Sequence, residues 1–212
     1  MTTAGQQTGN FKLIAGHISL DFTNTADWHA SQAPDERLTG YGDLLAWSQQ
    51  VGILTEHEVQ RLRDVAARYP AAAAAVLEQA IALRETLYRI FVAVAGRRTP
   101  AANDIALLNA ALAKAMARLQ LVATEGDWRW AWADGEDALD RMLWPVVWSA
   151  AELLTSEARW RVRVCADEQC GWLFLDMSRN RSRRWCAMED CGNRAKARRH
   201  YRRTRGTAAP AP

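Results

Sequence analysis

Residues 165–194 read CADEQCGWLFLDMSRNRSRRWCAMEDCGNR and contain all four cysteines of this 212-residue chain. The cysteines form two pairs, with four residues inside each pair and fifteen residues between the pairs. Zn²⁺ prefers tetrahedral sulfur ligation, and two short cysteine pairs joined by a hairpin-length spacer can supply four thiolates. The stretch therefore predicts a structural zinc site whose ligands are Cys165, Cys170, Cys186 and Cys191.

The residues around these cysteines predict a small finger. Residues 171–176 are typical of a short strand, residues 178–184 are rich in arginine, and the second cysteine pair opens a helix. A knuckle, a hairpin and a helix that carries the last ligands resemble a treble-clef-like finger. So small a segment buries too little surface to fold alone, and we therefore expect metal binding and folding to be coupled. A closed four-cysteine site leaves no open coordination position, which argues against zinc chemistry on a substrate.

The end of the finger is strongly basic. Residues 194–205, RAKARRHYRRTR, contain seven cations and no acid. Residues 160–212 carry a net charge of +8 and residues 1–159 a net charge of −5, which indicates an anionic partner for one end only. Arginine can bind phosphate and can form two hydrogen bonds to guanine. The predicted DNA contacts are Arg179, Arg181, Arg183, Arg184, Arg194, Lys196, Arg198, Arg199, Arg202 and Arg203. A solvated basic tail without a specific partner is the alternative.

The chain before the finger is predicted to be an α+β domain that is mainly helical with a small antiparallel sheet. The alternation of Ile18, Leu20 and Phe22 predicts a half-buried strand within residues 11–25. Residues 117–133 alternate around a turn and predict a hairpin. Apolar periodicity and stop signals predict helices over residues 41–51, 55–68, 70–95, 101–116 and 137–155.

Particular residues sharpen these expectations. Thr55 and Glu58 form a capping-box pattern at the start of the second helix, and Pro145 should kink the last one. The ten tryptophans include an alternating set, Trp128, Trp130 and Trp132, which we expect to seal the core between the hairpin and the helices. A ligand cage made of these aromatic rings is the alternative.

One candidate ligand site lies in the helical domain. Arg84 falls within the apolar arc of its helix, and a buried guanidinium needs a carboxylate or a ligand because an unpaired buried charge is very costly. Asp21 is the expected partner, with Asn24 nearby. We therefore have two hypotheses: Asp21, Asn24 and Arg84 line a polar pocket that senses a small molecule, or they form a purely structural buried ion pair.

Several classes of protein are not indicated. The chain has no Gly-rich phosphate loop, no Gly-x-Ser-x-Gly elbow and no His-Glu-x-x-His motif, so we expect no enzyme. No apolar run approaches the roughly 20 residues that span a bilayer, and the first residues lack a secretory signal. We expect a cytoplasmic protein without a membrane partner. In the reducing cytoplasm, clustered cysteines bind metal more often than they form disulfides.

Two sets of motifs resemble a known family. The two Cys-x4-Cys pairs and the literal sequence Cys191-Gly192-Asn193-Arg194 resemble the CGNR-type zinc finger. Residues 18–25, ISLDFTNT, and the Leu83-Arg84-Glu85 sequence look like motifs of the ABATE domain that precedes this finger in the family. The resemblance implies a stress-induced transcription regulator. Together with the end of the helical pattern and the low-complexity tail, it predicts three parts: an ABATE-like sensor or dimerisation domain (residues 1–158), a CGNR-type zinc finger with a basic helix (159–205) and a disordered tail (206–212).

The residues and the resemblance together predict a DNA-binding transcription regulator that holds Zn²⁺. Two further hypotheses stay open: a small-molecule effector that binds the N-terminal domain, and a homodimer. Three alternatives also stay open for the finger: an RNA-binding module, a protein-interaction module, and a thiolate–zinc redox sensor.

Overall fold

The computed structural model describes residues 11–133 and 137–206, with side chains as far as Tyr201. In these ranges the strands pair into antiparallel two-stranded sheets: β1 (Ala26–Asp27) with β2 (Asp35–Glu36), β3 (Leu119–Thr124) with β4 (Asp127–Trp132), and β5 (Val162–Val164) with β6 (Leu173–Leu175). The helices are α1 (Ile18–Thr23), α2 (Tyr41–Gln50), α3 (Glu56–Arg68), α4 (Pro70–Ala95), α5 (Ala102–Met116), α6 (Leu143–Thr155), α7 (Asn193–Gly206), and the short turns η1 (Glu157–Arg161) and η2 (Met188–Gly192). The predicted α+β class, mainly helical with small sheets, is confirmed.

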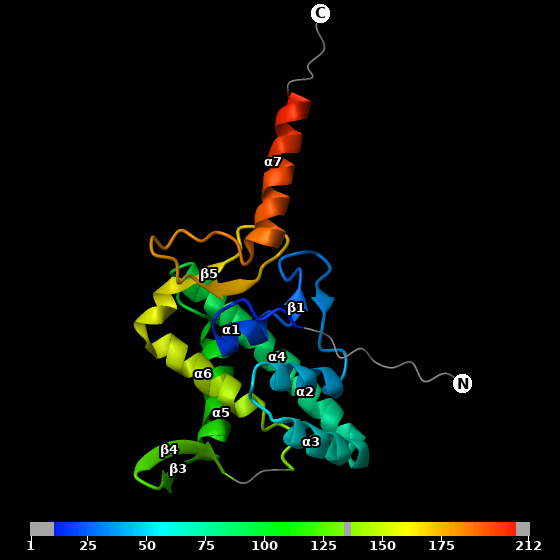
Figure 1. Cartoon of the computed structure of the whole chain (residues 1–212), viewed down its shortest axis with the longest axis vertical. Coiled ribbons are helices and arrows are strands. Elements are labelled where there is room, and N and C mark those ends of the chain that lie inside the picture. Colours follow the sequence, from blue (N-terminus) through cyan, green and yellow to red (C-terminus); the bar gives the residue numbers. More distant parts are fainter. Residues whose placement is uncertain (1–10, 134–136, 207–212) are drawn as a thin grey trace, which may run out of the picture.

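Helix α4 is the centre of the fold, and α1, α2, α3 and α5 pack against it (Figure 1). Its predicted apolar stripe is real, since Ala80, Leu87 and Ile90 are fully buried. Burying a large aliphatic side chain contributes about 1.5–3 kcal/mol, so this stripe is a major source of stability. On another side of α4, the guanidinium of Arg89 binds the carboxylate of Asp104 in α5 at 2.6 Å, which ties the two helices together.

The predicted capping box of α3 is present. The hydroxyl of Thr55 accepts from the backbone N–H of Glu58, and the Glu58 carboxylate accepts from the backbone N–H of Thr55 at 2.7 Å. Each bond satisfies an N–H that the first turn of a helix leaves without an intrahelical partner. The start of this helix was therefore readable from local sequence alone.

The strand predicted for residues 11–25 is wrong, because Ile18–Thr23 forms helix α1. Gly16 turns the chain with a φ of +77°, and the N–H of Asp21 then bonds to the carbonyl of His17 at 2.8 Å. α1 contacts α4, α6 and β6, and every residue of it from Ser19 to Thr23 is buried. Polar and apolar residues of α1 are both buried, so their alternation does not indicate a strand with one solvent-exposed face.

The kink predicted at Pro145 is also wrong, because α6 begins only at Leu143. Pro145 is therefore the third residue of the helix, in the first turn. A proline is tolerated there because its missing N–H would have had no intrahelical partner. Residues 134–136, which precede the expected start of this helix at residue 137, lie outside the described residues.

The hairpin predicted over residues 117–133 is confirmed, but its tryptophans do not seal the core. Trp128 and Trp130 are 66% and 61% exposed. Trp132 alone reaches the body, with its ring centroid 6.1 Å from that of Trp144 in α6. The hairpin lies at the end of the molecule opposite α7 (Figure 1).

The finger is continuous with the core of the helical body. Val162, Leu173 and Leu175 of the β5–β6 sheet are buried in the same apolar cluster as α1, α4 and α6. The N–H of Leu175 bonds to the carbonyl of Ala15, and the side-chain amide of Asn24 makes two hydrogen bonds with the backbone of Leu173. Removal of the finger would therefore expose part of this core to water.

Within the described ranges, no helix has both the length and the apolar character needed to cross a membrane.

Candidate metal centre and basic helix

The four cysteines come from three separate turns of the finger and meet at one point. Cys165 follows β5, Cys170 precedes β6, Cys186 ends the arginine-rich segment, and Cys191 lies in η2. Their Sγ atoms all lie within 4.8 Å of one another, and all four residues are buried. The Sγ atoms of Cys170 and Cys186 are 3.6 Å apart, and those of Cys186 and Cys191 are 3.5 Å apart. We call these four residues the cysteine cluster.

The size of the cysteine cluster fits a zinc ion. A tetrahedral ion with Zn–S bonds of about 2.3 Å would hold its sulfurs about 3.8 Å apart. The measured separations are close to that value, and the donor set is the one that structural zinc sites use. Cys165, Cys170, Cys186 and Cys191 would hold the ion, and the ion would fix the finger without an open position for a substrate.

The thiols of the cluster influence one another. The pKa of Cys165 is lowered because the thiols of Cys170 and Cys186 donate to it. The pKa values of Cys170 and Cys186 are raised, first because each holds its proton in a hydrogen bond to Cys165. Four thiolates at these separations would repel one another strongly, so a divalent cation among them is what allows all four to be ionised.

Backbone contacts hold the first knuckle, residues 165–170, in place. The N–H of Cys165 bonds to the carbonyl of Trp172 at 2.8 Å, and the N–H of His29 bonds to the carbonyl of Cys170 at 3.0 Å. Gly171 has a φ of +69°, and a Cβ at this position would lie 2.6 Å from the backbone nitrogen of Ala30. Only glycine allows this approach, so the loop after β1 lies directly against the cysteine cluster.

Helix α7 is bound to the first knuckle by a buried carboxylate. Asp167 has a fully buried side chain and accepts from Arg194 and Arg198, each at 3.0 Å. Burial alone would raise the pKa of Asp167, but the hydrogen bonds from the two arginines outweigh it and lower the pKa. Arg194 also donates to the Sγ of Cys191 at 2.9 Å. Sequence reasoning missed Asp167, although an acid inside the first cysteine pair was a signal.

The predicted DNA contacts divide into two groups. Arg194 and Arg198 bind Asp167, and Arg183 donates to the backbone carbonyls of Ile14 and Cys186 while its guanidinium lies 4.4 Å from the ring centroid of Phe174. These three side chains hold the finger together. The exposed cations are Arg179, Arg181, Arg184, Lys196 and Arg199. The side chains of Arg202 and Arg203 lie outside the described residues, as does the tail after Gly206.

The exposed cations lie on two elements. Arg179, Arg181 and Arg184 belong to the segment before Cys186, which we call the arginine loop (residues 178–184), whereas Lys196 and Arg199 belong to α7. Asp176 shapes the arginine loop, because its fully buried carboxylate accepts from the N–H and hydroxyl of Ser178 and from the N–H of Arg183. No ion pair in the described part of the chain involves the five exposed cations.

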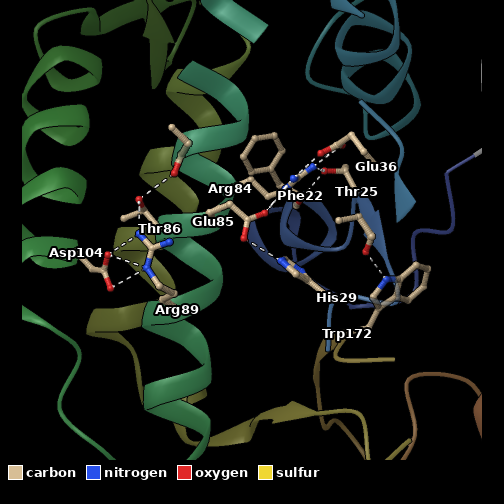
Figure 2. A network of polar contacts seen from close by, with 12 residues as sticks. Phe22, Thr25, His29, Glu36, Arg84, Glu85, Thr86, Arg89, Asp104 and Trp172 are labelled. Carbon is tan, nitrogen blue, oxygen red and sulfur yellow. Dashed lines mark hydrogen bonds and ion pairs between the residues drawn. The ribbon is translucent and has the colours of Figure 1, made fainter. Parts of the chain in front are cut away.

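The expected pair of Asp21 and Arg84 is not formed. Arg84 makes two hydrogen bonds of 2.6 Å to the carboxylate of Glu36 and one to Glu85, as Figure 2 shows. Asp21 instead accepts from the backbone N–H of Ala15, and burial raises its pKa to about 6. Asp21, Asn24 and Arg84 therefore do not line one pocket. Glu36 lies in β2, which pairs with β1 in a short sheet, and the position of this sheet depends on tertiary packing that the sequence does not reveal.

Arg84 begins a chain of polar contacts that leads through Glu85 to His29 (Figure 2) and from there to the cysteine cluster. Glu85 accepts from Arg84 and from the Nε2 atom of the buried His29 at 2.9 Å, and the ring of His29 stacks on Tyr88 at 3.7 Å. The backbone N–H of His29 then donates to the carbonyl of Cys170. The Leu83-Arg84-Glu85 sequence thus fixes the loop that supports the first knuckle.

A cavity of about 170 Å³ opens beside the cysteine cluster, between the loop after β1 and the finger. The rings of Phe11, Trp28 and Trp172 line it, together with Arg194 and two acid–base pairs. The pairs are Lys12 with Asp190 at 2.9 Å and Arg37 with Asp27 at 3.3 Å. Of the three residues expected to form a pocket, Asn24 lines this cavity.

Trp28, which lines this cavity, has an unusual backbone conformation. Its φ is +54°, a left-handed conformation that is uncommon for a bulky residue, and its ring lies 4.5 Å from the guanidinium carbon of Arg194. Strained residues of this kind persist where the surrounding structure determines them, and they concentrate in binding sites and switch regions.

Two family models match the chain. Residues 16–157 match ABATE, described as "Putative stress-induced transcription regulator", and residues 161–204 match the CGNR zinc finger. Both descriptions are of regulatory or zinc-finger types and neither is an enzyme family. A comparison with curated proteins finds no match. The first model covers more than half of the chain, and the second coincides with a four-cysteine cluster able to bind a metal ion, consistent with zinc. The chain belongs to the ABATE family and carries a CGNR zinc finger.

Proposed function

We propose that this protein binds DNA through its finger, with Zn²⁺ held by Cys165, Cys170, Cys186 and Cys191. The observation that carries the proposal is the attachment of the basic helix α7 to the cysteine cluster through Asp167. A flexible basic tail would pay an entropic cost on binding, whereas a helix held at a fixed angle presents its cations ready for a phosphate backbone.

The exposed cations have separate roles in this proposal. Arg179, Arg181 and Arg184 of the arginine loop and Lys196 and Arg199 of α7 contact DNA phosphates or base edges. Arg202 and Arg203 remain predicted DNA contacts from the sequence alone. Arg183, Arg194 and Arg198 are positioning residues that orient it. Phosphate contacts supply most of the affinity, because each neutralised phosphate releases condensed counterions.

Fluorescence anisotropy with the zinc-loaded full chain tests the proposal. We expect a mixed pool of genomic duplex fragments to bind more tightly than single strands or RNA of the same length at the same salt. Replacement of Lys196 and Arg199 by glutamine should weaken duplex binding, whereas the same change at Arg63 and Arg68 of α3, exposed cations far along the chain, should not. A preference for RNA, or equal loss in both variants, would contradict DNA binding by the finger.

A redox role for the cysteine cluster is the second candidate. The contact between Arg194 and the Sγ of Cys191 favours the thiolate form, which is the form that oxidants attack. If the cluster is a sensor, mild peroxide should release zinc and loosen α7 at the same time. Zinc retention after peroxide treatment, measured with a colorimetric chelator, would rule this role out. If the finger instead binds other proteins, replacement of the exposed cations Lys196 and Arg199 should leave duplex binding unchanged.

We also propose that a small-molecule effector binds in the cavity beside the cysteine cluster. Two acid–base pairs beside three aromatic rings suit a small zwitterion with an aromatic body, such as an aromatic amino acid. Arg194 lines the cavity and also positions α7, so an occupant would contact the base of the DNA-binding helix directly.

Calorimetric titration with three probes of the same ring tests the effector site. Phenylalanine carries both charges, hydrocinnamate only the negative charge and phenethylamine only the positive charge. We expect phenylalanine to bind most tightly and Arg37→Gln to weaken phenylalanine binding at least tenfold, with Arg63→Gln as the control. Equal binding of the three probes, or no saturable heat with any of them, would contradict the site.

A regulator of this kind needs no catalytic residue, and we propose that it acts in the cytoplasm.

A further inference from the structure

Towards the tip of the β3–β4 hairpin, one face is apolar, and no other element in the described part of the chain covers it. Strand pairing places Leu121 opposite Trp130 and Ala123 opposite Trp128, so these four side chains share a face. Leu121, Trp128 and Trp130 are 53%, 66% and 61% exposed. We call this surface the tryptophan face. The opposite face carries Gln120, Thr124, Asp127 and Arg129, together with the partly buried Val122 and Ala131.

The base of the hairpin is anchored and its tip extends beyond the anchor. Trp132 packs against Trp144 of α6, and the guanidinium carbon of Arg118 lies 5.7 Å from the Trp144 ring centroid. Beyond these contacts the pairing continues to the turn at Gly126, whose φ of +83° closes the hairpin. A two-stranded hairpin is only marginally stable in water unless another layer covers its apolar face. The tip therefore requires a partner surface.

We infer that the tryptophan face is the contact surface of a homodimer, in which two copies stack these faces about a two-fold axis. A second copy supplies a surface of the same apolar chemistry, because a two-fold contact brings the same patch to both sides. Two antiparallel sheets packed face to face bury their inner side chains in this way.

The area of the tryptophan face suits a dimer. Its exposed side chains present roughly 400 Å² of apolar surface, taking about 250 Å² for a whole tryptophan. A standard interface buries about 800 Å² on each partner, of which somewhat more than half is apolar. Tryptophan is also the residue type most enriched among those that dominate binding energy.

The charges favour a second copy over other partners. The tryptophan face contains no charged side chain, so it has no attraction for a polyanion or for an anionic lipid surface, and two copies meet without like-charge repulsion. The hairpin also lies at the end of the molecule opposite α7 (Figure 1). Pairing through the hairpin would therefore leave both basic helices accessible.

Sedimentation equilibrium of the zinc-loaded full chain, over a wide range of protein concentration and without DNA, tests the inference. We expect the wild type to be a dimer and Trp128→Lys/Trp130→Lys to raise the dissociation constant about 30-fold or more, which corresponds to losing one dominant contact. Tyr69→Lys, at a residue 60% exposed beside α4, is the control and should leave the dimer intact.

A second measurement locates the contact. Hydrogen exchange should show amides of residues 119–132 more protected at high protein concentration than at low concentration, and this difference should vanish in the double variant. A monomeric wild type, a dimer that persists in the double variant, or a dimer lost in Tyr69→Lys would overturn the inference. Because none of these measurements contains DNA, failure here is distinct from failure of DNA binding.

Discussion

Asp167 and Arg194 form the contact that directs the basic helix: the Nε of Arg194 lies 3.0 Å from the Oδ2 of a carboxylate that is fully buried. The same carboxylate binds Arg198, one turn later in α7. The chain continues from Cys191 almost directly into α7, so the cysteine cluster fixes where this helix begins. The ion pairs of Asp167 with Arg194 and Arg198 fix the direction in which the helix leaves the finger. The position and the direction of α7 therefore depend on different residues and can be separated by mutation.

Asp167→Asn should weaken DNA binding even though it makes the finger more positive. Simple charge attraction predicts tighter binding, whereas loss of the helix anchor predicts weaker binding, and we expect the second effect to win. We expect a stability loss of about 1–2 kcal/mol, limited by the partial exposure of both arginines. Anisotropy and urea unfolding at saturating zinc measure the two effects. Glu168→Gln, the same charge change at the exposed neighbouring residue, is the control and should not weaken binding.

Arg194→Gln and Arg199→Gln should differ in stability but not in charge. Arg199 is exposed, so its replacement should change the free energy of unfolding by less than about 0.5 kcal/mol and reduce the salt slope of DNA binding by about 0.9. Arg194→Gln should also lower the unfolding midpoint, because it removes contacts to Asp167 and Cys191. Equal stability of the two variants would show that Arg194 has no positioning role.

Arg84→Met should destabilise the protein by about 2–3 kcal/mol, because it leaves the carboxylates of Glu36 and Glu85 facing each other without their cation. The estimate lies below that for a fully buried pair since both carboxylates are about one-third exposed. Glu36→Gln in the same background should restore part of the loss. Arg61→Met, which breaks an exposed pair with Asp137, should cost less than about 1 kcal/mol. Urea unfolding at saturating zinc compares the three.

The raised pKa of Asp21 gives a pH test. Between the usual value near 3.8 and the folded value of about 6, the folded state holds more protons than the unfolded state. Stability from this group is therefore present in acid and is lost as the pH rises through that window. Asp21→Asn keeps an oxygen for the Ala15 N–H and does not titrate. From about pH 5 to about pH 7, the unfolding free energy of the variant should rise relative to wild type by about 1 kcal/mol. A constant difference would contradict the pKa shift.

The features that sequence predicted well are those set by local spacing. The cysteine spacing indicated the zinc finger because metal coordination demands four sulfurs close together, and the long periodic pattern of α4 could only be a buried helical stripe. Thr55 and Glu58 marked a helix start through contacts three residues apart. In each case the physical cause acts within a short segment or through the metal itself.

The predictions that failed concern features that depend on contacts between segments far apart in the sequence. Helix α1 is enclosed on all sides, so alternation of Ile18, Leu20 and Phe22 carried no information about a wet face. Arg84 was correctly expected to need a carboxylate, but the choice between Asp21 and Glu36 depends on how a distant loop folds back. Alternating tryptophans showed which side chains share a face of the hairpin, but periodicity cannot say whether anything covers that face. Asp167 was missed because its partners lie 27 and more residues away.

The salt dependence of DNA binding tests the central claim most directly. Anisotropy titrations of one duplex at several salt concentrations give the slope of log affinity against log salt for the zinc-loaded wild type and for a variant with glutamine at Arg179, Arg181, Arg184, Lys196 and Arg199. We predict that the variant keeps its zinc and fold but has a slope smaller in magnitude by up to about 4.5, since each of the five lost phosphate contacts removes about 0.9. A variant with an unchanged slope would show that the finger does not hold the DNA.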